Sequence, residues 1–209
     1  MKASLGRLHV LVDSVSLAEA ALEGGAPTLQ VRLKLGSDRR RFDTVAAIAD
    51  RCRAAGATCI VDDRGDFAVA AGADGVHVGD EDLSVAAVRR VVGSHLLVGA
   101  TARNPESARR LVAAGADYLG VGPSYASGTK PDLPDPLGVE GVREVAASVP
   151  VPVIAISGVT AERVPELLAA GAWGVAVIGA VARADDPREA THALVTAVAR
   201  ASVPEDVGT

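Results

Sequence analysis

The stretch that decides the fold is Ala114-Gly115-Ala116-Asp117-Tyr118-Leu119-Gly120-Val121. An apolar, Ala-rich segment ends at its glycine, and a short apolar run of the kind found in buried strands follows at once. Glycine just beyond a helix readily takes the left-handed conformation that residues with a β-carbon disfavour. The stretch therefore predicts a helix that ends and passes directly into a buried strand.

This junction recurs along the chain. Further copies lie at 55–61, 71–78 and 170–178, and a weaker copy lies at 24–31. A repeated helix-to-strand junction is typical of a parallel sheet whose strands are joined by helical crossovers. Function in such folds is expected at the opposite ends of the strands, where each strand leads into the next helix.

Eight strand–helix units can be counted. We predict strands at 8–12, 28–33, 57–62, 74–78, 95–99, 117–121, 152–156 and 173–178, and helices at 15–24, 42–55, 65–71, 84–92, 104–114, 139–147, 160–170 and 187–201. This predicts a single α/β domain, a (β/α)8 TIM barrel over residues 1–201, with 202–209 as a flexible C-terminal tail. A doubly wound open sheet is the alternative. The turn Val12-Asp13-Ser14 lacks a Gly-x-Gly-x-x-Gly pattern, which weakens its dinucleotide-binding form.

Composition indicates a soluble barrel. Apolar residues make up 49% and aromatic residues 2%, so we expect Val, Ala, Leu and Ile to fill the core and the barrel interior. No apolar run is long enough to span a bilayer, and the start of the chain has no targeting signal. A net charge of −5 argues against a nucleic-acid partner. Cys52 and Cys59 lack metal-ligand spacing, and we expect them to be buried in a cytoplasmic protein. A homodimer stays open.

Basic and acidic residues follow neighbouring strands. Gln30, Arg32 and Lys34 alternate and so should project together, which suits a polyanionic substrate, although a solvated basic edge is the alternative. Asp63 and Asp82 follow the next two strands and are candidate Mg²⁺ ligands beside these cations. Helix capping is the alternative for the acidic residues, and it is the simpler explanation for Asp80 and Glu81.

Three later segments suit phosphate. The long loop 122–138 carries the donors Ser127, Thr129 and Lys130 and is a candidate active-site lid, or else a Pro/Gly connector. Gly158 follows the seventh strand and Ile178-Gly179 ends the eighth, and small residues there let backbone N–H groups approach a phosphate. Tight packing is the alternative for both glycines.

Taken in order, these segments resemble the thiamine-phosphate synthase family. That family has Gln-x-Arg-x-Lys on strand two, Asn-Asp after strand three and Gly-Gln-Glu-Asp after strand four. It also has a Gly-Pro…Thr-x-Thr-Lys loop and a Gly-Gly-Ile phosphate turn. The matching segments are 30–34, 62–63, 79–82, 122–131 and 157–159, and the resemblance runs from about Leu8 to Arg200.

The resemblance implies a transferase of thiamine biosynthesis. Hydroxymethylpyrimidine diphosphate loses pyrophosphate, and the ring nitrogen of thiazole phosphate takes its place. The resemblance implies Mg²⁺ on Asp63 and Asp82, and catalytic neutralisation of the departing pyrophosphate by Arg32, Lys34 and Lys130. The substrate-binding residues that it implies are Gln30, Arg32, Lys34, Asp62, Thr101, Ser127, Thr129, Lys130, Gly158, Ile178 and Gly179.

The chain departs from the family pattern at several site positions. Asp62 stands where the family has Asn, and Arg103 stands where it has His, so we expect Arg103 to offset the added carboxylate. Thr101 keeps the hydroxyl of the family Ser, and Ser157 and Gly179 also differ. These changes leave open a divergent paralogue that is non-catalytic or tautomerase-like and binds a phosphorylated thiazole. Sugar-phosphate epimerases would require other strand-end acids and histidines, and His77 is expected to be a packed core residue.

Overall fold

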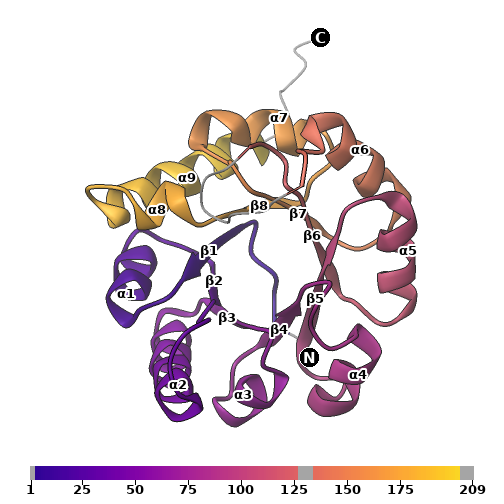
Figure 1. Cartoon of the computed structure of the whole chain (residues 1–209). Coiled ribbons are helices and arrows are strands. Elements are labelled where there is room, and N and C mark those ends of the chain that lie inside the picture. Colours follow the sequence, from indigo (N-terminus) through magenta and orange to yellow (C-terminus); the bar gives the residue numbers. More distant parts are fainter. Residues whose placement is uncertain (1–2, 127–133, 203–209) are drawn as a thin grey trace.

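The computed structural model describes residues 3–126 and 134–202, and it is a closed barrel of parallel strands in the order β1 to β8 (Figure 1). The strands are β1 Leu8–Val12, β2 Thr28–Val31, β3 Thr58–Asp62, β4 Gly75–Val78, β5 Leu97–Ala102, β6 Tyr118–Val121, β7 Val153–Ile156 and β8 Gly174–Val177. β8 pairs with β1, with Leu8 opposite Val175, so no strand edge remains open. The predicted (β/α)8 TIM barrel is confirmed, and the open sheet is excluded.

Helices follow the strands and form an outer ring (Figure 1). They are α1 Val15–Glu23, α2 Asp38–Ala55, α3 Gly65–Ala70, α4 Val85–Val92, α5 Pro105–Ala113, α6 Gly138–Ser148, η1 Ala161–Arg163, α7 Val164–Ala169, α8 Gly179–Ala182 and α9 Pro187–Ser202. Among the described helices, none is both long enough and apolar enough to cross a membrane.

The glycine junctions behave as the sequence predicts. Gly56, Gly72, Gly115 and Gly171 follow α2, α3, α5 and α7, and each has a positive φ, between 64° and 102°. Each lies within the three residues that precede the next strand. A side chain with a β-carbon is strained in that conformation, so glycine lets each helix end directly below the following strand.

Several predicted boundaries were wrong. α2 begins at Asp38 rather than at residue 42, because the Ser37 side chain accepts a hydrogen bond from the Arg40 backbone and caps the helix. β5 begins two residues later than predicted, and His95 before it is exposed. The predicted helix 160–170 is divided into η1 and α7, with Pro165 in the first turn of α7. The short helix α8 and the inclusion of Ser202 in α9 were not predicted.

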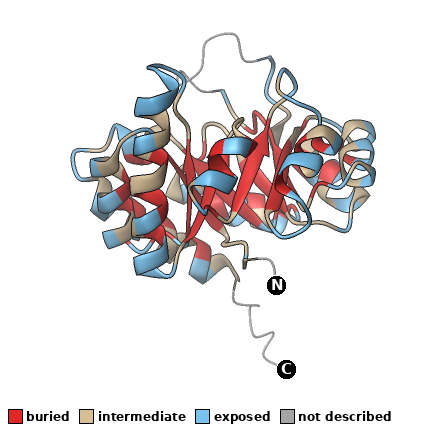
Figure 2. Cartoon of the chain, turned by 90° about the horizontal axis from the view of Figure 1, so that it is seen from below, coloured by how far each residue is buried: buried red, intermediate tan, exposed pale blue. Residues whose placement is uncertain are grey.

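The core has two parts. Alternate strand residues such as Val10, Val12 and Val61 join the large cluster between the strands and the helices (Figure 2). Leu11, Tyr118 and Ile154 belong to a smaller cluster on the other face of the strands, inside the barrel. The prediction of a Val, Ala, Leu and Ile core holds for the first part.

The barrel interior differs from that prediction because it also holds buried polar side chains. His9, Gln30 and His77 are at most 9% exposed, and the His9 ring lies edge-on to Tyr118 with 5.5 Å between ring centroids. Burial lowers the pKa of His9 to about 3, and the neighbouring His77 acts in the same direction. The barrel interior is thus not purely aliphatic.

We expect His9 to make the fold sensitive to acid. The unfolded chain protonates this imidazole near its ordinary pKa of 6.5, whereas the folded chain takes the proton only near pH 3. The unfolded state therefore binds more protons between these values, and stability falls as the pH falls through that window. Replacing His9 by Leu should lower the slope of unfolding free energy against pH by about 1.4 kcal/mol per pH unit between about pH 4 and pH 6.

Urea unfolding at a series of pH values measures this slope. The matched control is His95→Leu, since the His95 side chain is exposed, and it should keep the slope of the unaltered chain. Equal slopes for His9→Leu and the unaltered chain would contradict a buried neutral His9.

Candidate active site

Asp62 at the end of β3 is held by residues from β2 and the loop after it. Gln30 Nε2 donates to Asp62 Oδ1 at 2.5 Å, and Arg32 Nε lies 3.5 Å from Asp62 Oδ2. The Asp62 side chain is 9% exposed. Burial and the neighbouring Asp63 raise the pKa of Asp62 to about 6, while Gln30, Lys34 and Arg32 act in the opposite direction.

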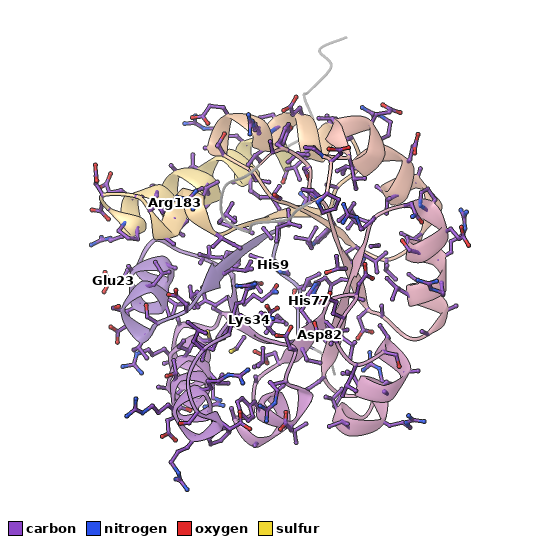
Figure 3. The ribbon with its side chains drawn as sticks, in the orientation of Figure 1. His9, Glu23, Lys34, His77, Asp82 and Arg183 are labelled. Carbon is purple, nitrogen blue, oxygen red and sulfur yellow. The ribbon has the colours of Figure 1, made fainter. Side chains whose placement is uncertain are left out.

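Asp63 and Asp82 come together across the ends of β3 and β4. Lys34 Nζ donates to Asp63 Oδ2, and Asp82 Oδ2 accepts from the Gly79 backbone N–H at 2.8 Å. Figure 3 shows Lys34 and Asp82 pointing to the same central region at the barrel mouth. Asp63 has φ 63°, a conformation uncommon for a residue with a side chain, which is a feature often found at functional sites.

The two carboxylates influence each other's ionisation. Burial opposes ionisation of Asp63, but the hydrogen bonds from Lys34 and with Asp82 outweigh it and lower the Asp63 pKa. Burial and Asp63 raise the pKa of Asp82, against the Gly79 hydrogen bond. Two close carboxylates that depend on a cation for neutralisation form a cation-binding arrangement.

Helix capping does not account for these acids. Ser84, and not an acidic residue, caps α4 by accepting from the Ala87 backbone. The start of α3 has no side-chain cap, so neither Asp62 nor Asp63 serves there. Asp80 and Glu81 are exposed, and neither caps α4, contrary to the explanation suggested for them.

Thr101 on β5 belongs to a chain of polar groups inside the barrel. Its Oγ1 lies 3.0 Å from His77 Nε2, and His77 Nδ1 lies 3.2 Å from the Tyr118 hydroxyl. Burial lowers the pKa of His77 to about 4, so this imidazole is neutral at neutral pH. The prediction that His77 is a packed core residue is confirmed, but no sequence motif indicated its contact with Thr101.

The turn after β7 is tied to the loop after β6. Ser157 and Gly158 have φ 79° and 66°, and a β-carbon on Gly158 would lie 2.7 Å from Tyr125 Cβ. The Tyr125 backbone N–H donates to Ser157 O at 3.1 Å, and Arg163 Nη1 donates to Gly158 O at 2.5 Å. Glycine at 158 is therefore required both by its conformation and by the close approach of Tyr125.

Sequence reasoning missed Tyr125 and Arg163. The Arg163 guanidinium lies 4.2 Å from the Tyr125 ring centroid, and the Tyr125 hydroxyl donates to Glu166 on α7. Both residues fix the turn by contacts between segments far apart in sequence, so no local motif indicates them. Ile178 and Gly179 lead into α8, where the Arg183 guanidinium occupies the space that a β-carbon on Gly179 would need.

The structure brings six of the predicted site residues together. Gln30, Arg32, Lys34, Asp62, Asp63 and Asp82 form one connected group. Ser127, Thr129 and Lys130 lie outside the described residues. Among the described residues, no group of three or more His, Cys, Asp and Glu side chains could hold a metal ion, so a metal here would depend on the Asp63–Asp82 pair and on substrate oxygens.

Comparison with known proteins identifies the family. The family model described as thiamine monophosphate synthase matches residues 8–181. The chain belongs to this family. It is 48% identical over 204 residues to the thiamine-phosphate synthase of Salinispora arenicola (strain CNS-205), covering 93% of this chain and 98% of that protein. It is 43% identical over 196 residues to the thiamine-phosphate synthase of Chloroflexus aurantiacus, covering 90% of each.

A solved structure agrees with these relatives. The thiamine phosphate pyrophosphorylase from Pyrococcus furiosus superposes with a TM-score of 0.88 at 34% identity, covering 94% of this chain and 97% of that chain. The strand-end residues described above therefore belong to a thiamine monophosphate synthase barrel.

The carboxylate of Asp62, which stands where the family has Asn, contacts other cations than the one we predicted. The cations that act on Asp62 are Lys34 and Arg32, and Arg103 is not among the groups that shift its pKa. Arg103 lies just before α5, and its backbone N–H donates to Ser107 Oγ at 3.3 Å. The expected compensation by Arg103 is thus not what the described contacts show, because Arg103 follows β5, whereas Arg32 follows β2, the strand that pairs with β3.

We expect Asp62 to be coupled to Arg32 and not to Arg103. In double-mutant cycles of unfolding free energy, Asp62→Asn with Arg32→Gln should show a coupling of at least about 0.5 kcal/mol. Asp62→Asn with Arg103→Gln should be additive within about 0.3 kcal/mol. A larger coupling to Arg103 than to Arg32 would contradict this assignment.

Proposed function

We propose that this chain joins hydroxymethylpyrimidine diphosphate to thiazole phosphate, releasing pyrophosphate and forming thiamine phosphate. The connected group of Gln30, Arg32 and Lys34 with the acids of β3 and β4 carries the proposal. The printed names of the relatives support it, because they are thiamine-phosphate synthases covered over nearly their whole length.

The reaction demands stabilisation of a leaving group. The bond between the pyrimidine methylene carbon and the diphosphate oxygen breaks, and its electron pair leaves with the pyrophosphate. Arg32 and Lys34 lie at the barrel mouth and would neutralise that growing charge, with Lys130 joining them. The attacking thiazole nitrogen has a free electron pair, so no general base is assigned.

Asp63 and Asp82 fit a magnesium ion. They offer hard carboxylate oxygens on adjacent strands, and Lys34 already supplies positive charge to Asp63. We assign them as the ligands, with diphosphate oxygens completing the coordination. When bound, Mg²⁺ would add positive charge beside the departing pyrophosphate. Lys34 would then turn from Asp63 toward the diphosphate.

Thiazole phosphate, the other substrate, is expected to bind at a separate part of the barrel mouth. We assign the phosphate of thiazole phosphate to the backbone around Gly158, Ile178 and Gly179, after β7 and β8, and the family resemblance adds the hydroxyls of Ser127 and Thr129 as donors. Gln30 would orient the pyrimidine, with Asp62 fixing the direction of its amide. We also place the protein in the cytoplasm, which suits two free, buried cysteines, and a homodimer remains compatible with this site.

We expect thiamine phosphate formation to need Mg²⁺ and both strand-end acids. Purified protein is mixed with the pyrimidine diphosphate, thiazole phosphate and Mg²⁺, and thiamine phosphate is detected by chromatography. Asp63→Ala and Asp82→Ala should each lower kcat/KM by about a hundredfold or more, because the metal's charge stabilisation is worth several kcal/mol. Asp80→Ala is the matched control, since Asp80 is exposed and lies two residues from Asp82.

Two outcomes would contradict different parts of the proposal. No product from the unaltered, folded chain would support the non-catalytic paralogue. Full turnover in excess chelator, or unaltered rates in both Ala variants, would refute the metal assignment and leave the reaction itself standing.

A further inference from the structure

The polar chain below the substrate mouth runs across three neighbouring strands. Tyr118 begins β6, Thr101 lies near the end of β5 and His77 lies in β4. Their side chains meet inside the barrel, with Tyr118 Oη 3.2 Å from His77 Nδ1 and Thr101 Oγ1 3.0 Å from His77 Nε2. Figure 3 shows His77 in the central part of the barrel.

Two glycines make room for this chain. Gly99 lies opposite both His77 and Tyr118 in the strand register, and a β-carbon there would overlap the Tyr118 ring. Gly120 lies opposite Thr101, and a β-carbon there would lie 3.0 Å from His77 Cε1. The absence of side chains at Gly99 and Gly120 therefore leaves the space in which the Tyr118 phenol contacts the His77 imidazole, below Thr101.

The heavy-atom positions leave the hydrogen-bond directions open, and we assign them by letting the buried Tyr118 hydroxyl donate its proton. Tyr118 is 1% exposed and its pKa is raised well above its ordinary value by burial, so the phenol keeps its proton. Donation of this proton to His77 Nδ1 makes Nδ1 the acceptor of the neutral imidazole. The remaining imidazole proton is then on Nε2, and it is donated to Thr101 Oγ1.

This direction decides what Thr101 can offer. A threonine hydroxyl has one proton and two lone pairs. Since one lone pair accepts from His77, the Thr101 proton is directed elsewhere. Thr101 is only partly buried and lies two residues beyond Gly99 toward the mouth of the barrel. Its hydroxyl proton can therefore point toward the side on which the substrate is expected to bind.

We propose that Tyr118 and His77 are positioning residues that hold the Thr101 hydroxyl as a hydrogen-bond donor to an acceptor atom of the pyrimidine diphosphate. The inference rests on the proposed function for the identity of that substrate. Without the Tyr118 hydroxyl, the neutral His77 imidazole would be free to carry its proton on Nδ1 and to accept the Thr101 proton at Nε2. The Thr101 hydroxyl would then no longer be committed to the substrate.

A first experiment reads the tautomer directly, without substrate or activity. Nitrogen chemical shifts of a ¹⁵N-histidine-labelled protein report which ring nitrogen carries the proton. We expect the unaltered chain to show His77 protonated on Nε2, and Tyr118→Phe to shift His77 toward the Nδ1-protonated form. Assignment of the signal uses His77→Gln. An unaltered chain with Nδ1 protonated would overturn the proposal, whether or not the protein is a synthase.

A second experiment measures the affinity for the substrate. Dissociation constants for the pyrimidine diphosphate, measured by calorimetry with Mg²⁺, should rise about tenfold in Thr101→Val, because a hydrogen bond to a substrate acceptor is lost. Thr101→Ser should bind as the unaltered chain does. Thr44→Val is the matched control, since Thr44 lies on α2 and donates to Arg40 O.

The positioning role is separated from a structural one by non-additivity. Tyr118→Phe should weaken binding in the unaltered chain but have no further effect in a Thr101→Val background. His77→Gln, whose side-chain amide can replace the Nε2 donor, should bind more tightly than His77→Leu. Equal losses from Tyr118→Phe in both backgrounds would assign Tyr118 to packing alone and overturn the proposal.

Discussion

The site depends on the neutralisation of partly buried carboxylates by cations that follow the neighbouring strand. Asp62, Asp63 and Asp82 converge at the ends of β3 and β4, where burial opposes their charge. Arg32 and Lys34 follow β2 and contact Asp62 and Asp63. The pairing of parallel strands brings these residues together, because β2, β3 and β4 are adjacent in the barrel. The same acids and cations are the groups that a magnesium diphosphate requires.

The chain's own residue at position 62 shows how such a site tolerates change. A carboxylate where the family has an amide adds negative charge beside the expected diphosphate. Gln30 and Arg32 both bind Asp62, and burial raises its pKa toward neutrality. The added charge is thereby paired with Arg32 and hydrogen-bonded to Gln30. The departure is thus absorbed inside the strand-end group, which favours a working synthase over a non-catalytic paralogue.

Local chemistry made the fold predictable from the sequence. The Ala-Gly junctions indicate where helices end, and the count of eight strand–helix units favoured a barrel over the doubly wound sheet before any contact was known. The strand-end residues also followed, since Gln30, Arg32 and Lys34 alternate at the end of β2 and in the segment directly after it. The capping of α2 by Ser37 and the division at Pro165 displaced boundaries, because caps depend on single side-chain hydrogen bonds.

Contacts across the barrel could not be predicted in the same way. His77 is 24 residues from Thr101 and 41 residues from Tyr118 in the sequence. The clamp of Arg163 and Tyr125 on the turn at Gly158 likewise joins two loops. The charge partner of Asp62 was predicted wrongly for this reason, since Arg103 is suggested by a motif position and Arg32 by spatial adjacency. Sequence motifs thus indicate which residues reach the mouth, and only packing indicates which of them touch.

The most direct test of the account is the affinity for inorganic pyrophosphate, titrated calorimetrically with Mg²⁺ and again in excess chelator. If Asp63 and Asp82 hold the metal that receives the leaving group, pyrophosphate should bind at least about tenfold more tightly with Mg²⁺. The difference should vanish in the Asp63→Asn, Asp82→Asn double variant. Equal affinity with and without Mg²⁺ in the unaltered chain would contradict the central claim.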